Sequence, residues 1–163
     1  MVHFRPRQLL ILPGLKVRSE ADLLPRLATP TVQRGVRIIT EAHAAGVTMA
    51  SSCAGSFVLA QAGLLSGKPG TTAWWLALAL RRMHPDVILK DDQLVVATWP
   101  VVTAGAALAQ MNLMLTIVAK FPSPGLSHAC ARYLLMDMRS SQVLYIAVSL
   151  LARRDEHISR AET

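Results

Sequence analysis

The stretch from Val47 to Trp75 constrains the fold of this chain more than any other. It opens with a short apolar run at residues 47–50, passes through the small residues Ser51-Ser52-Cys53-Ala54-Gly55, and becomes apolar again at residues 57–62. This order predicts a buried strand, a tight turn and a helix. The turn would hold Cys53 at the start of the helix, where backbone N–H groups and the helix dipole favour a thiolate.

The rest of the chain alternates between strand-like and helix-like patterns. Short strands are expected over residues 8–12, 87–89, 94–98 and 101–103, and helices over residues 20–27 (one or two turns), 29–46 (with Thr29 as cap), 55–62, 74–83, 105–120 and 126–136. This alternation predicts an α/β fold with a parallel sheet. Asp91-Asp92 is interpreted as a hairpin turn between two of the strands. Leu108, Met111, Leu115 and Val118 are expected to face inward.

Composition supports a sheet that is buried on both faces. Hydrophobic residues make up 52% of the 163 residues and charged residues 17%. A membrane protein would also be this apolar, but Gln110 and Asn112 interrupt the longest charge-free run, where a spanning helix would bury them at a cost. The net charge of +7 comes from scattered basic residues without interleaved aromatics, so it indicates a solvated surface rather than a nucleic-acid site.

The two cysteines indicate neither a disulfide nor a metal site. Cys53 and Cys130 form no CxxC pair, and the five histidines show no metal-ligand spacing. Cys130 is interpreted as a core residue, because it lies at helical spacing with Leu126 and Tyr133-Leu134. The apolar run near the N-terminus lacks a signal-peptide pattern, so a reducing cytoplasm is expected.

The segment SSCAGSFVLAQAGLLSGKPGTTAWWLA resembles the core motif of the ThiJ/PfpI family, the class I glutamine amidotransferase-like domains. More narrowly, it is similar to the version fused to AraC-type transcription regulators. Further matches in PDVILKDDQLVV, VVTAGAALAQMNLMLTIV and ARYLLMDMRSSQVLYI extend the resemblance from Leu9 to about Ala161. The resemblance implies a flavodoxin-like three-layer sandwich with a mostly parallel sheet.

The resemblance also implies a site. Cys53 matches the nucleophile position of the family, on a strand–turn–helix nucleophile elbow, and backbone N–H groups near Gly14 and Ala54 match its oxyanion positions. A small-ligand pocket is expected at the carboxyl ends of the strands. Its expected residues are Gly14, Cys53, Ala54, Thr72, Ala73 and Gly105. No cofactor or metal is expected.

The sequence departs from the family at one chemically decisive position. Many relatives carry a histidine in an A-T-T-H-W segment, where it could pair with the cysteine. This chain reads Thr71-Thr72-Ala73-Trp74. An alanine cannot move a proton, and none of the five histidines fits as a replacement by position.

Both ends also depart from the family pattern. The family's N-terminal strands, one of which carries an acidic residue that hydrogen-bonds the cysteine, are expected to be missing, and so is the helix-turn-helix domain beyond Thr163. The expected organisation is one domain over residues 1–152 and a charged tail over residues 153–163. An uncovered strand edge predicts self-association or pairing with an intact copy of the domain. Direct DNA binding by this chain is not expected, because it shows no helix-turn-helix pattern.

Together these features predict a non-catalytic, small-ligand-sensing regulatory domain. The alternative is a cysteine-dependent hydrolase, or an enzyme like the isonitrile hydratases that this family also contains, using Cys53. A third reading, a remnant without independent function, stays open at this point.

Overall fold

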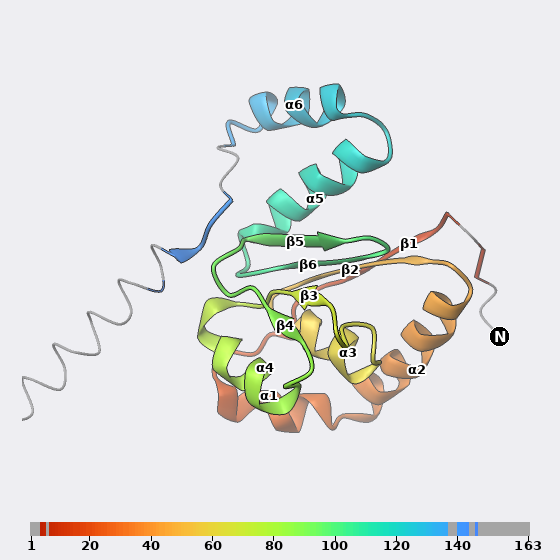
Figure 1. The fold of residues 1–163 in the computed structure, drawn as a ribbon, viewed down its shortest axis with the longest axis vertical. Helices are drawn as coiled ribbons and strands as arrows, with labels where there is room; N and C mark the ends of the chain where they lie inside the picture. Colours follow the sequence, from red (N-terminus) through yellow and green to blue (C-terminus); the bar gives the residue numbers. More distant parts are fainter. Residues whose placement is uncertain (1–3, 6, 137–139, 144–145, 147–163) are drawn as a thin grey trace, which may run out of the picture.

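A mostly parallel four-stranded sheet organises the fold. The computed structural model describes residues 4–5, 7–136, 140–143 and 146 (Figure 1). The strands lie in the order β1 (Leu9–Leu12), β2 (Thr48–Ser52), β6 (Val101–Ala104) and β5 (Val95–Thr98). β1, β2 and β6 run parallel, and β5 pairs with β6 in the antiparallel sense. The predicted α/β class with a mostly parallel sheet is therefore confirmed.

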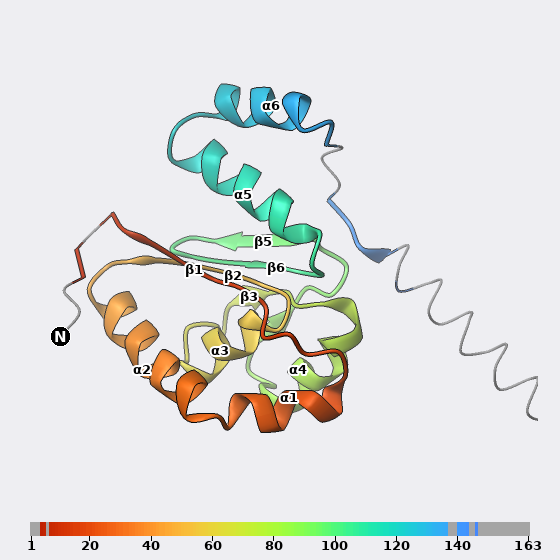
Figure 2. The same cartoon turned by 180° about the vertical axis from the view of Figure 1, so that it is seen from behind.

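Helices cover both faces of this sheet, which gives three layers (Figures 1 and 2). One layer holds α1 (Glu20–Leu27), α2 (Pro30–Ala44), α3 (Gly55–Gln61) and α4 (Ala77–Met83), the last preceded by a 3-10 turn, η1 (Trp74–Leu76). The other layer holds α5 (Ala109–Lys120), with α6 (Pro124–Tyr133) packed on its outer side. A small second sheet pairs β3 (Pro69–Gly70) with β4 (Ile88–Leu89).

The alternation of side chains along the strands divides the core in two. Met49 and Val101 belong to the larger hydrophobic cluster, which includes residues of α1 to α4. Their neighbours Ala50 and Val102 belong to the second cluster, with Leu113 of α5. Successive residues of a strand point to opposite faces of the sheet, so a sheet covered on both sides takes mostly apolar residues on both faces, although β2 also buries Thr48, Ser51 and Ser52. This requirement accounts for the apolar composition.

The helices begin and end at local signals in the sequence. At the start of α1, Ser19 and Asp22 form a reciprocal capping box, in which each side chain accepts from the other residue's N–H. Thr29 stands at the N-cap of α2 as predicted, although its hydroxyl donates to the Arg26 carbonyl at 2.8 Å instead of capping the helix. Gly46 follows the end of α2 at φ +82°, a left-handed conformation that glycine adopts readily.

The predicted hairpin around Asp91-Asp92 is wrong. The two strands on either side of this turn belong to different sheets, because β4 pairs with β3 and β5 pairs with β6. Asp91-Asp92 connects the small sheet to the large one. Local turn chemistry indicates where the chain bends, but it does not specify which strands pair.

The predicted inward face of the helix at residues 105–120 is only partly right. The helix begins at Ala109, and Leu108 in the preceding loop is 83% exposed. Ala109, Leu113 and Ile117 form the stripe that faces the sheet, whereas Met111 is largely exposed. Leu115 is buried as predicted. Its backbone carbonyl accepts from the Ser127 hydroxyl of α6 at 2.8 Å, which ties α5 to α6.

α6 differs from its sequence interpretation. Only Ser127 and Ala131 of this helix are buried, because α6 lies against α5 alone. Cys130 is half-buried rather than a core residue, and Tyr133 is 90% exposed. In the described part of the chain, no helix is both long and apolar enough to cross a membrane. The tail predicted over residues 153–163 lies outside the described residues.

Candidate functional site

Cys53 lies at the corner between a strand and a helix, as the sequence predicts. β2 ends at Ser52 and α3 begins at Gly55. The backbone of Cys53 has φ +53°, a left-handed conformation that is uncommon for a residue with a side chain. Its N–H donates to the carbonyl oxygens of Ala104 (3.0 Å) and Gly105 (2.8 Å). The end of β6 therefore holds the corner in place.

The carbonyl group of Cys53 is also held from two sides. It accepts from the Ser56 hydroxyl at 2.8 Å, within the first turn of α3. It accepts as well from the Thr72 hydroxyl at 3.1 Å. Thr72 is fully buried, so this second bond is shielded from water and ties a distant loop to the cysteine corner.

Two glycines allow the end of β1 to approach this corner. A Cβ on Gly14 would lie 3.3 Å from the Cβ of Cys53 and 3.8 Å from its Sγ. A Cβ on Gly55 would lie 3.0 Å from the carbonyl oxygen of Pro13. The structure thus brings Gly14, Cys53 and Gly55 together, and a side chain at either glycine would crowd the site.

The thiol of Cys53 is not activated as the sequence suggested. Burial raises the pKa of the Cys53 thiol, and a hydrogen bond from the Ala54 N–H opposes this effect without cancelling it. No charged side chain of the described residues contributes to the shift. The prediction that the helix terminus favours a thiolate therefore underestimated desolvation, which disfavours the charged form.

The loop before η1 is fixed by buried hydrogen bonds. The Thr71 N–H donates to the Thr103 hydroxyl at 2.8 Å, and the Thr71 hydroxyl donates to the Gln93 carbonyl at 3.0 Å. Ala73 follows in this loop and is completely buried in the larger hydrophobic cluster. The side chain at this position, which the resemblance matches with a histidine of the family, is a methyl group that can neither donate nor accept a proton.

Gln142 is the residue that sequence reasoning missed. Its side chain is fully buried, and its Nε2 donates to the carbonyl oxygens of Asp91 (2.7 Å) and Thr72 (3.3 Å). Its Oε1 lies so close to Gly105 that a Cβ there would be 2.5 Å away. No spacing pattern marks this glutamine, which follows the polar pair Ser140-Ser141. Only long-range contacts place it at the site.

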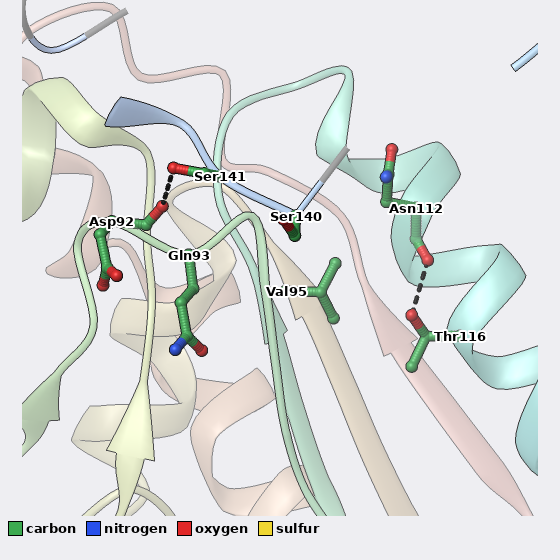
Figure 3. Close-up of a pocket in the computed structure, with 7 residues that line it drawn as sticks. All are labelled: Asp92, Gln93, Val95, Asn112, Thr116, Ser140 and Ser141. Carbon is green, nitrogen blue, oxygen red and sulfur yellow. Dashed lines mark hydrogen bonds between the residues drawn. The ribbon is translucent and has the colours of Figure 1, made fainter. Parts of the chain in front are cut away.

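Residues of the segment at 140–143 contribute to the lining of two cavities. One has a volume of about 530 Å³ and is lined mainly by apolar residues, with Trp74, Trp75 and Gln142 among them and Cys53 not among them. The other has a volume of about 450 Å³ and a more polar lining. Figure 3 shows this second cavity, in which the Ser141 hydroxyl donates to the Asp92 carbonyl at 3.0 Å. Its lining residues are Asp92, Gln93, Val95, Asn112, Thr116, Ser140 and Ser141.

The described residues contain no group of three or more His, Cys, Asp or Glu side chains that could hold a metal ion.

Solved structures with the same architecture include ThiJ/PfpI and DJ-1 proteins and transcriptional regulators. A ThiJ/PfpI family protein from Pseudomonas syringae superposes with a TM-score of 0.65 at 21% identity, over 82% of this chain and 51% of that one. The chain has the ThiJ/PfpI fold. An AraC family transcriptional regulator from Pseudomonas putida superposes with a TM-score of 0.62 at 20% identity, over 78% of this chain and 63% of that one. DJ-1beta of Drosophila melanogaster gives 0.60 at 21% identity, over 79% and 64%. The predicted resemblance is thereby confirmed as a likeness of fold.

The chain is also similar in sequence to a transcriptional regulator. The HTH-type transcriptional regulator CdhR of Pseudomonas aeruginosa is 30% identical over 102 residues, which cover 63% of this chain and 29% of the regulator. The chain thus spans less than a third of that relative's length. No model of a known protein family matches the chain.

Proposed function

We propose that this chain is a small-ligand-sensing domain of the AraC-type regulator group and that it does not turn its ligand over. The observation that carries the proposal is the state of Cys53. Its thiol is half-buried and its pKa is raised, and among the described residues no charged side chain lowers that pKa. Nucleophilic catalysis by a thiol needs the opposite, a group that generates the thiolate.

Two further observations support a binding role. A cavity of about 530 Å³ lies next to the loop that follows Thr72, and its mainly apolar lining suits a small ligand. The similarity to the regulator CdhR and the fold shared with an AraC family regulator point in the same direction.

One observation favours the alternative, a cysteine-dependent hydrolase or isonitrile-hydratase-like enzyme. Cys53 has φ +53° at a strand–helix corner, the arrangement that a nucleophile elbow requires. Such left-handed residues cluster at functional sites because their strain must be supported by the surrounding structure. Thr72, Ala104 and Gly105 provide that support here.

The experiment that separates the two functions compares the unmodified protein with Cys53→Ser and Ala73→His variants. A metabolite collection is screened by thermal shift, and small amides and isonitriles are assayed for turnover. We expect ligands that raise Tm in both the unmodified and the Cys53→Ser proteins, without turnover by either. Activity that appears only in Ala73→His would also support the sensor. Cys53-dependent turnover by the unmodified protein would establish the enzyme instead.

We also propose that the domain spans residues 1–152 and acts in the cytoplasm without binding DNA itself. We propose further that it self-associates. β1 is an edge strand in the described structure, and Ile11 on it is 38% exposed. An open, apolar strand edge is a template for pairing with another chain. Sedimentation of the protein as a well-behaved monomer, together with failure to copurify with a tagged second copy, would contradict self-association.

A further inference from the structure

The side-chain amide of Gln142 is buried in a small site, here called the seat, whose carbonyl groups accept hydrogen bonds from an NH2 group. Two backbone carbonyls, those of Asp91 and Thr72, take both hydrogen bonds from its Nε2. If the amide were reversed, its oxygen would face two carbonyl oxygens, so the network fixes its orientation. The seat therefore suits a nitrogen that carries two hydrogens, one for each carbonyl oxygen.

The other half of the same amide is unsatisfied. Oε1 of Gln142 is buried and has no hydrogen-bond partner in the described structure. Room for it exists only because residue 105 is a glycine, since a Cβ there would come within 2.5 Å of Oε1. A buried acceptor without a donor is destabilising. Within the described structure, the Gln142 amide is thus held in its place through its nitrogen alone.

The seat adjoins the apolar cavity. Gln142 itself lines that cavity, together with Trp74, Trp75 and Met111. Withdrawal of the Gln142 side chain would join the seat to the cavity of about 530 Å³. The joined space has an apolar wall and, at one end, the two carbonyl acceptors.

We propose that Gln142 occupies the seat of a ligand's primary carboxamide, so that the ligand of this domain is a compact apolar molecule ending in CONH2. The apolar body lies in the cavity, and the NH2 group donates to the carbonyls of Thr72 and Asp91 in place of Gln142. This inference rests on the proposed sensing function, for which it names the ligand class. A carboxylate does not fit this seat, because its oxygens carry no hydrogen to donate to the two carbonyl oxygens.

Displacement of the Gln142 side chain should also loosen the segment at residues 140–142 that carries it. The Gln142 N–H donates to the Asp92 carbonyl at 2.9 Å, and the Leu94 N–H donates to the Ser140 carbonyl at 3.0 Å. These two backbone bonds hold residues 140–142 against the turn before β5. A ligand that displaces the Gln142 side chain is expected to loosen them, which couples binding to the position of residues 140–142.

The first test is a chemical rescue with three matched probes: isobutyramide, N,N-dimethylisobutyramide and isobutyrate. The variant Gln142→Ala opens the seat, and Gln142→Leu fills it without an NH2 group. Isobutyramide at ten times its Kd is expected to raise the Tm of Gln142→Ala by roughly 3–6 °C. The other two probes are expected to leave that Tm unchanged, and Gln142→Leu is expected to respond to none. Equal shifts with all three probes, or no shift with isobutyramide, would overturn the proposal.

The second test uses the unmodified protein, so it holds even if Gln142→Ala does not fold. Hydrogen exchange is followed at the amides of Gln142 and Leu94 during titration with isobutyramide. Binding with faster exchange at both amides supports displacement, and binding with unchanged exchange, or no binding, overturns it. Repeating the titration in Cys53→Ser separates the two proposals. Cys53-dependent amide turnover sinks the sensing function, whereas absent shifts without turnover sink only the carboxamide seat.

Discussion

The hydroxyl group of Thr72 donates a hydrogen bond to the carbonyl oxygen of Cys53 across 3.1 Å. The carbonyl of Thr72 in turn accepts from Nε2 of Gln142 at 3.3 Å. One residue thus links the strained cysteine corner to the buried glutamine near the end of the described chain. We expect these two hydrogen bonds to couple the position of the cysteine corner to that of residues 140–143.

Replacing Thr72 by valine should weaken the cysteine corner. Thr72→Val removes the donor to the Cys53 carbonyl but leaves the Ser56 bond to the same oxygen. We therefore expect a loss of about 1 kcal/mol in the free energy of unfolding, measured by urea denaturation. Thr72→Ser keeps the donor and serves as the control. A valine variant as stable as the unmodified protein would show that this bond contributes nothing.

The stability of the protein should fall at alkaline pH because of Cys53. Burial raises the pKa of this thiol in the folded state above its value in the unfolded chain. Its contribution to stability is therefore fully present below the unfolded pKa of roughly 8.5 and is lost as the pH rises through the folded value. Unfolding free energies measured across this window should decline more steeply for the unmodified protein than for Cys53→Ala. Parallel pH profiles for the two proteins would be inconsistent with this pKa shift.

The alkylation rate of Cys53 tests the raised pKa of its thiol independently. Iodoacetamide reacts with the thiolate, so Cys53 should react more slowly than a free cysteine derivative at every pH below its raised pKa. The rate is measured by peptide mass against pH. Reaction of Cys53 at a lower pH than the free thiol would reveal an activated nucleophile and favour the enzymatic alternative.

Alanine substitutions at Gly55, in the cysteine corner, and at Gly35, in α2, form a matched pair that tests how tightly the corner is packed. A Cβ on Gly55 would meet the carbonyl oxygens of Pro13 at 3.0 Å and Leu12 at 3.2 Å, so Gly55→Ala must shift backbone. We expect it to cost about 1–3 kcal/mol of stability. Gly35, inside α2, has nothing within 4 Å of its Cβ position, and Gly35→Ala should stabilise by about 0.5–1 kcal/mol. Both values come from chemical denaturation, and equal effects of the two substitutions would contradict the close approach at Gly55.

The sequence predicted those parts of the fold that depend on local signals. The strand–turn–helix around Cys53 and the position of Thr29 at the N-cap of α2 follow from patterns within a few residues. The position of Gly14 beside Cys53 was predicted through the family resemblance, and the structure places them in contact range. Their agreement shows that short-range patterning and the resemblance describe the same corner.

Other features depended on long-range pairing or on burial. The partner of β4 could not be chosen by the Asp91-Asp92 turn, because pairing is decided by the whole sheet. The raised pKa of Cys53 depends on how much protein surrounds the thiol. Gln142 reaches Thr72 across 70 positions of the chain, and no spacing rule detects such a contact. Each of these depends on the folded structure and not on local sequence.

The contact between Gly105 and Gln142 should appear as coupling in a double-mutant cycle. A Cβ on Gly105 would lie 2.5 Å from Oε1 of Gln142, so we expect Gly105→Ala to displace the glutamine side chain. Gln142→Ala removes the same side chain directly. Both single variants lose the same two hydrogen bonds from Nε2, and the double variant should lose little more than either one. We expect a coupling of at least about 0.5 kcal/mol in unfolding free energy. Additive losses would mean that alanine at position 105 leaves Gln142 in its seat.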